Sequence, residues 1–122
     1  MKSNNKKITV LACSGASNTG AYSDKVARKL MSAGKAKMLC LARFAVDKQF
    51  AEQSRKELGE LGDEGELIII DGCTVNCAEA VMKGSDFLKY RHINTTDFGI
   101  VKGKTPVTEE KISEIVESIL NE

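Results

Sequence analysis

The chain has 122 residues, which is the length of one domain with a single hydrophobic core. Hydrophobic residues make up 42% and charged residues 29% of the sequence, as in an ordinary globular protein. The formal net charge is only +1, so no basic excess points to nucleic acid. No apolar run approaches the roughly 18–20 residues of a membrane span. We therefore expect neither a nucleic-acid nor a membrane partner.

The N-terminal segment, residues 1–7, is polar, and we expect it to be a flexible tail. The apolar run Ile8 to Ala12 precedes Cys13 and could be mistaken for a lipoprotein cleavage site. It is shorter than the roughly 7–15 residues of a signal core, so we interpret it as a buried strand. The expected location is therefore cytoplasmic. In that compartment cysteines are more often metal-binding or redox-active than disulfide-bonded.

Short apolar runs bounded by turn residues predict strands, and apolar residues at helical spacing predict helices between them. In the first half of the chain, we predict a strand at Ile8–Ala12, a small polar loop at Cys13–Gly20, a helix at about Ala21–Ala33, a strand at Ala36–Ala42 and a helix that Asp47 caps and that ends at about Leu61. In the second half, we predict a strand at Leu67–Asp71, a helix at Thr74–Lys83 and a weaker strand at Leu88–Ile93. A short extended piece at Phe98–Val101 and a last helix that Thr108 caps complete the prediction. Gly34 and Gly84 are placed to end the first and third of these helices.

Strands alternate with helices, and the strands are apolar throughout, which is typical of a parallel sheet covered on both faces. The predicted fold class is α/β, a three-layer sandwich with a mainly parallel open sheet of the Rossmann or flavodoxin type. We expect residues 1–122 to form one such domain, without internal repeats or linkers. Right-handed crossovers and one switch in winding direction predict the strand order 2-1-3-4.

All four cysteines of the chain map to one edge of this predicted sheet. Cys13 lies just past the first strand, Cys40 near the end of the second, and Cys73 and Cys77 just past the third. Thr74 is a good N-cap, so Cys77 would be the third helical position, where unpaired N–H groups and the helix dipole favour a thiolate. A shared site at the carboxyl edge is the resulting hypothesis, against the alternative that the thiols are small buried hydrophobes.

Four thiolates would form a closed tetrahedral zinc site with a net charge of about −2, and such a centre needs hydrogen-bond donors and positive charge around it. An iron–sulfur cluster would also accept four cysteines. The spacing of the cysteines matches neither zinc-finger nor ferredoxin signatures. The groups expected around the metal are the loop residues Ser14 and Asn18, the helix start at Thr74, and Lys102 or Lys104.

The combination of Asp71-Gly72-Cys73 with Cys77, Cys13-Ser14-Gly15, Cys40-Leu41-Ala42 and Thr96-Asp97-Phe98-Gly99-Ile100 resembles the DGC-domain family, which is named for its Asp-Gly-Cys motif. The resemblance extends from Ile8 to about Lys102, and the charged, helix-like stretch from Arg43 to Gly65 departs most from it. The family is described as zinc-binding through four cysteines, without an established reaction. The resemblance therefore implies one zinc ion, held by Cys13, Cys40, Cys73 and Cys77.

The alternative is a cysteine-based redox or sulfur-transfer protein in which Cys73 and Cys77 act with Cys13 or Cys40 as the resolving thiol. Cys13 and its small polar loop are also similar to the anion-binding loop of low-molecular-weight phosphatases. Those loops end in an arginine, and here none occurs before Arg28. A small-molecule or protein thiol partner and a homo-oligomer both stay open.

Few other side chains carry a chemical signal. His92 is the only histidine, and its place on the weakest strand predicts a surface or edge position. Asp71 could orient the turn at Gly72 or accept a hydrogen bond beside the metal site, and the turn alone would explain it. Asn18 could cap the first helix, which we favour, or touch a ligand. The sequence has no Ser-His-Asp set, no phosphate-binding loop of the Walker type and no dinucleotide fingerprint. No catalytic residue is therefore assigned, and whether the protein is an enzyme stays undecided.

Overall fold

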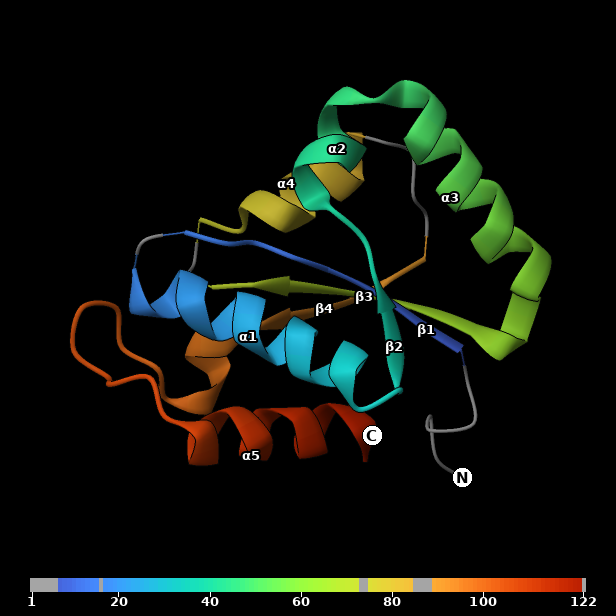
Figure 1. Cartoon of the computed structure of the whole chain (residues 1–122). Coiled ribbons are helices and arrows are strands. Elements are labelled where there is room, and N and C mark those ends of the chain that lie inside the picture. The colour runs from blue at the N-terminus through green and yellow to red at the C-terminus, as the bar shows by residue number, and fades with distance from the viewer. Residues whose placement is uncertain (1–6, 16, 73–74, 85–88, 122) are drawn as a thin grey trace.

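The computed structural model describes residues 7–15, 17–72, 75–84 and 89–121. These residues form a parallel sheet with the order β2-β1-β3-β4, as the sequence predicts (Figure 1). In chain order the elements are β1 (Lys7–Ala12), α1 (Asn18–Ser32), β2 (Ala36–Met38), α2 (Leu41–Val46), α3 (Lys48–Leu61), the 3-10 helix η2 (Gly62–Glu64), β3 (Gly65–Asp71), α4 (Cys77–Gly84), β4 (Arg91–Asn94), the 3-10 helix η3 (Thr95–Phe98) and α5 (Glu109–Leu120). None of the helices in the described ranges has the length and apolar character needed to cross a membrane.

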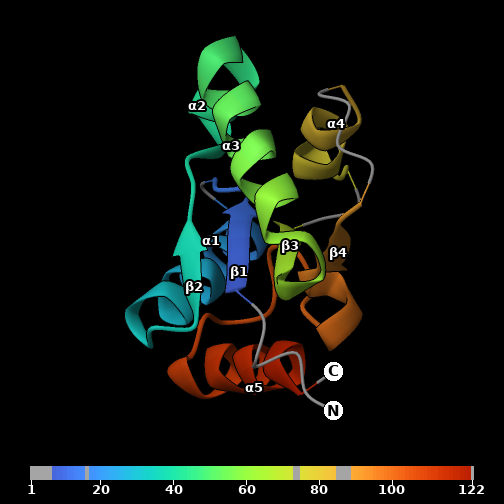
Figure 2. The same ribbon diagram turned by 90° about the vertical axis from the view of Figure 1, so that its right-hand side faces the viewer.

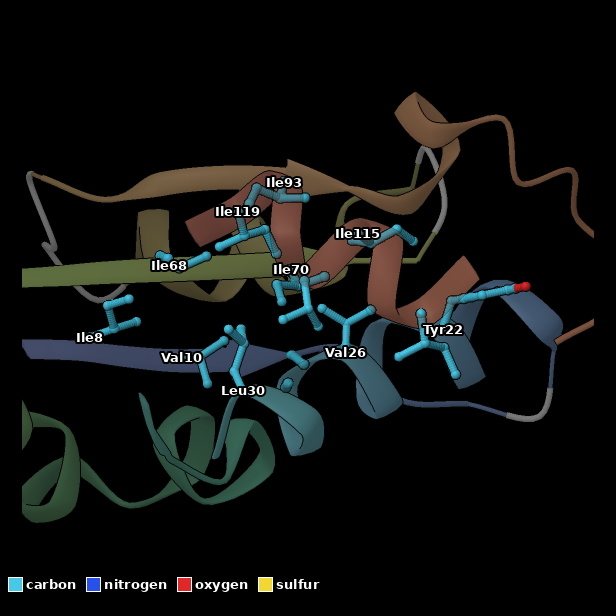
Figure 3. Packing of buried hydrophobic residues seen from close by; sticks show 14 of the residues in the cluster. Ile8, Val10, Tyr22, Val26, Leu30, Ile68, Ile70, Ile93, Ile115 and Ile119 are labelled. Carbon is cyan, nitrogen blue, oxygen red and sulfur yellow. The ribbon is translucent and has the colours of Figure 1, made fainter. Parts of the chain in front are cut away.

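Helices cover both faces of the sheet, so the predicted three-layer sandwich is confirmed. Helices α1 and α5 lie on one face, and α2, α3 and α4 on the other (Figures 1 and 2). Successive strand residues point to opposite faces, so Val10 and Ile68 pack under α1 and α5 while Leu11 and Ile69 face the other layer (Figure 3). Burial on both faces explains why these strands are continuous apolar runs.

Most of the predicted helix boundaries are also confirmed. Asp47 caps α3 by accepting a hydrogen bond from Phe50 N at 3.1 Å, and Thr108 caps α5 in the same way. Gly34 adopts a left-handed conformation with a φ of 74° just after α1, as a glycine that ends a helix does. Helix α1, however, begins at Asn18 and not at Ala21, and its N-cap is Ser17. The prediction that Asn18 caps this helix was therefore wrong.

The second strand is shorter than predicted and ends at Met38. Cys40 is not inside a strand, because its carbonyl and its sulfur accept hydrogen bonds from the first turn of α2. This early turn buries Phe44 beneath the sheet, where its ring meets that of Phe50 edge to face at 6.5 Å. The apolar run that predicted one strand up to Ala42 is divided between a strand and a helix, and such a run alone does not separate the two.

Three other boundaries differ from the prediction. Lys7, predicted to lie in a flexible tail, is the first residue of β1 and pairs with Gly65 of β3. Strand β4 begins at Arg91, and Leu88, the predicted start, lies outside the described residues. The predicted extended piece at Phe98–Val101 does not form as one segment. Phe98 is the last residue of η3, Gly99 caps η3 with a φ of 81°, and Ile100 and Val101 belong to neither a helix nor a strand.

Candidate functional site at the carboxyl edge of the sheet

The described cysteines lie at the predicted edge of the sheet. Cys13 directly follows β1, is half-buried, and donates its backbone N–H to the carbonyl of Ile70 at 2.9 Å. Cys40 follows β2 as an exposed residue and accepts a hydrogen bond on its sulfur from Arg43 N at 3.4 Å. Cys77 is exposed at the start of α4, and Cys73 lies outside the described residues.

These thiols follow neighbouring strands, but they do not form a ready-made ligand set. Among the described residues, no group of three or more histidine, cysteine, aspartate or glutamate side chains is arranged to hold a metal ion. The fold accounts for their common edge, because the carboxyl ends of parallel strands meet there.

Helix α4 begins at Cys77 and not at Thr74, which corrects the prediction that Cys77 is its third residue. Its first turn is capped from the preceding strand. The carboxylate of Asp71, which is only 1% exposed, accepts hydrogen bonds from Ala78 N at 2.7 Å and Glu79 N at 3.0 Å. A carboxylate at this position satisfies two of the unpaired N–H groups and complements the helix dipole. Asp71 is thus more than a turn residue.

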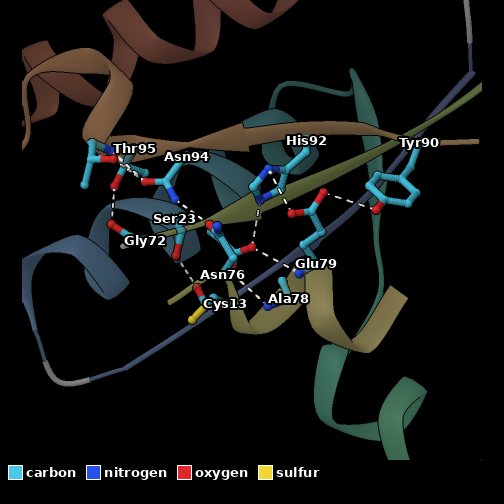
Figure 4. Close-up of polar contacts among 12 residues, drawn as sticks. Cys13, Ser23, Gly72, Asn76, Ala78, Glu79, Tyr90, His92, Asn94 and Thr95 are labelled. Atoms are coloured by element: carbon cyan, nitrogen blue, oxygen red, sulfur yellow. Dashed lines mark hydrogen bonds and ion pairs between the residues drawn. The ribbon is translucent and has the colours of Figure 1, made fainter. Parts of the chain in front are cut away.

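Three side chains from β4 and η3 fix the segment that contains the Asp-Gly turn (Figure 4). His92 contacts the Asp71 carboxylate through Nε2 at 2.8 Å. Asn94 donates to the Asn76 side chain at 2.7 Å, and Thr95 donates to the carbonyl of Gly72 at 2.8 Å. We call His92, Asn94 and Thr95 the β4 clamp. It holds residues on both sides of positions 73–74.

The β4 clamp was missed by the sequence analysis, which expected His92 at the surface or edge of the sheet. His92 does lie on the edge strand β4, but its side chain is only 22% exposed and contacts the Asp71 carboxylate, which the sequence analysis did not predict. A signal was present, because a carboxylate at the end of a buried apolar run needs donors. Polar residues end the next strand, and the register pairs Asp71 with Asn94. The match between the Asp71 carboxylate and the polar residues of β4 can be recognised only once the pairing of β3 with β4 is known.

A second carboxylate extends the contact between α4 and β4. Glu79 lies 3.7 Å from His92 Nδ1, and the hydroxyl of Tyr90 donates to its other oxygen at 3.2 Å. Burial raises the pKa of Tyr90, and the hydrogen bond to Glu79 and its negative charge raise that pKa further. The imidazole of His92 therefore lies between two carboxylates, and the network ties α4 to the sheet.

Two glycines let backbone segments of the site touch. A Cβ atom on Gly72 would lie 2.5 Å from the carbonyl oxygen of Thr19, and one on Gly20 would lie 2.8 Å from Gly15 N. Neither position has room for a side chain without a shift of the backbone. The first turn of α1 therefore packs directly on the turn after β3, which explains the glycine in the Asp-Gly motif.

The other residues expected around the metal have different positions. Asn18 binds the 101–105 loop, because its side chain donates to Val101 O and Thr105 O and accepts from Gly103 N at 2.7–2.9 Å. Lys102 is exposed on this loop, and Ser14 is exposed after β1. Thr74 lies outside the described residues. Asn18 therefore holds the Lys102 loop against the start of α1.

Comparison with known proteins gives one finding. A family model described as the DGC domain matches residues 9–119, nearly the whole chain. The matched range contains the four cysteines, Asp71 and the β4 clamp. Neither the curated proteins nor the solved structures include a significant match to this sequence.

Proposed function

This chain belongs to the DGC domain family, and we propose that it binds one zinc ion through Cys13, Cys40, Cys73 and Cys77. The main support is positional, since the cysteines follow three neighbouring strands at one edge of the sheet. Thiolates are ligands that zinc prefers. Because such a site is closed, it serves as a structural link between the strands, and no reaction is assigned to it.

The mobility of the ligands decides whether this donor set can hold zinc. Cys13 is anchored by its backbone hydrogen bond to β3, whereas Cys40 and Cys77 are exposed at helix starts. The start of α2 can shift at little cost, since the ends of helices fray easily, whereas the start of α4 is held by the Asp71 carboxylate. The proposal therefore assigns any adjustment of the ligands on zinc binding to the segment with Cys40.

The site would carry a net charge of about −2, which donors and cations around it must offset. The proposal assigns this role to the backbone N–H groups of the loop that contains Ser14, to Thr74 and to the ammonium group of Lys102. Asn18 contributes indirectly, because it fixes the 101–105 loop. A cytoplasmic location belongs to the same proposal, since thiols stay reduced there.

The test is elemental analysis by mass spectrometry of protein purified without chelator, combined with a thiol count before and after chelation. We expect about one zinc ion per chain and thiols that react fully only after chelation. Each of the four Cys→Ser variants should lose the zinc. Ser32→Ala, which removes an exposed hydroxyl at the far end of α1, is the control and should retain it.

A second candidate is the cysteine-based redox or sulfur-transfer protein, favoured by the exposure of Cys40 and Cys77. In its redox form two thiols become a disulfide, and two electrons and two protons pass to an added oxidant. Mild oxidation should then lower the number of reactive thiols, and a reductant should restore it. Metal-free protein with four reactive thiols would overturn the zinc proposal in favour of this one. Iron in place of zinc would also overturn it and indicate an iron–sulfur cluster.

A further inference from the structure

A cavity of about 610 Å³ lies at the carboxyl end of β1 and β2, between α1, α2 and α4. Its volume falls within the roughly 300–1,000 Å³ of typical small-molecule sites. No residue of the β4 clamp lines it. The lining residues are Ala12, Ser14, Asp24, Arg28, Met31, Met38, Leu39, Cys40, Leu41, Ala42, Ala45 and Val81. Of the proposed zinc ligands that the structure describes, only Cys40 lines the cavity.

Most of the cavity wall is apolar. Met31 of α1, Met38 of β2 and Val81 of α4 approach it from three different elements. Met31 is 43% exposed, so an apolar ligand would cover surface that water now contacts. Methionine side chains are flexible and adapt to ligands of irregular shape. The wall therefore suits a hydrocarbon group.

The polar groups lie together on α1 and in the loop before it. Arg28 Nε donates to the carboxylate of Asp24 at 2.8 Å, one helical turn earlier. Within the described ranges this is the one hydrogen bond or ion pair given for Arg28, and its side chain is 63% exposed, so its terminal Nη atoms are available to a ligand. A guanidinium offers its donors as a planar fork that matches a carboxylate. Asp24 thus holds Arg28 in place without occupying that fork.

From this arrangement we propose that the cavity binds a small monocarboxylic acid with a hydrocarbon chain. The chain lies among Met31, Met38 and Val81, and the carboxylate is bound by the Nη atoms of Arg28. The residues that bind the acid are not zinc ligands, but Cys40 lines the same cavity. The titration is therefore performed after chelation, so that its outcome is independent of whether the protein binds zinc.

The test is a titration with octanoate, followed by NMR of protein labelled at the methionine methyl groups. The methyl signals of Met31 and Met38 should shift and saturate. Met82 is fully buried and does not line the cavity, so its signal should shift less than those of Met31 and Met38. Octanol and acetate should bind more weakly, because one lacks the charge and the other lacks the chain.

Two variants locate the proposed contacts. Arg28→Gln should weaken octanoate binding about tenfold, the usual effect of losing a charge-assisted hydrogen bond. Lys25→Gln makes the same charge change at an exposed position of α1 outside the cavity and should leave the affinity unchanged. Ala45→Phe should weaken binding by filling the cavity. The proposal is overturned by octanoate that gives no saturable shift, or by octanol that binds equally well with Arg28→Gln without effect.

Discussion

The two halves of the carboxyl edge differ in how their polar groups are satisfied. On the β3–β4 half, Asp71 is buried and accepts hydrogen bonds from α4, and His92, Asn94 and Thr95 hold the surrounding turn. On the β1–β2 half, Cys40 is exposed and a cavity opens beside Arg28. We call these the clamped half and the open half. The clamped half holds its turn in one fixed geometry, whereas the open half leaves its thiol and its cavity accessible to solvent and ligands.

Removal of the central carboxylate should break the clamped half. Asp71→Ala leaves the N–H groups of Ala78 and Glu79 without their acceptor and removes the partner of His92. We expect a loss of about 3 kcal/mol or more in the free energy of unfolding, measured by urea denaturation. Asp71→Asn retains one acceptor oxygen and should lower the free energy of unfolding by less than Asp71→Ala. A loss below about 1 kcal/mol for Asp71→Ala would contradict the role assigned to the clamp.

The contact between the turn and α1 can be tested by adding one methyl group. Gly72→Ala places a Cβ atom against the carbonyl of Thr19 and should cost about 1–3 kcal/mol, because the backbone must move. Gly15→Ala is the matched control, since nothing lies within 4 Å of its Cβ position. Both stabilities can be compared in urea. Equal stabilities of the two variants would disprove the close contact.

The open half should tolerate a substitution that the clamped half does not. In metal-free protein, Cys40→Ser should change the free energy of unfolding by no more than about 0.5 kcal/mol, because Cys40 is exposed. The measurement is again urea denaturation, performed after chelation. A large loss without metal would show that Cys40 is part of the framework.

The smallest expected effect is the pH dependence of the clamped half. Since burial and Glu79 raise the pKa of Tyr90, its neutral form is favoured in the folded state. The corresponding stability is present below the ordinary tyrosine pKa of about 10 and is lost as the pH rises through the folded value. Titration of tyrosinate absorbance, with Tyr90→Phe for subtraction, should show ionisation of Tyr90 above pH 10. Ionisation of Tyr90 at or below about pH 10 would contradict the raised pKa.

The parallel sheet could be predicted from the sequence because continuous apolar runs such as Leu67–Asp71 are distinctive of buried parallel strands. Its strand order followed from the handedness of the crossovers and one switch in winding direction. The end of β2 could not be predicted, since the apolar run through Cys40 is compatible with a strand and with a helix start. The common edge of the cysteines followed from strand direction alone. The contact between Asp71 and His92 could not be predicted from strand direction, because it depends on the register in which β3 pairs with β4.

The close contact between Gly72 and Thr19 has a mechanical consequence for the site. Where two backbones touch, no side chain can change rotamer to absorb a displacement, and closely packed interiors transmit strain. A displacement of the first turn of α1 would therefore have to move the Gly72 turn with it. The start of α1 and the end of β3 thus behave as one rigid unit at this edge of the sheet.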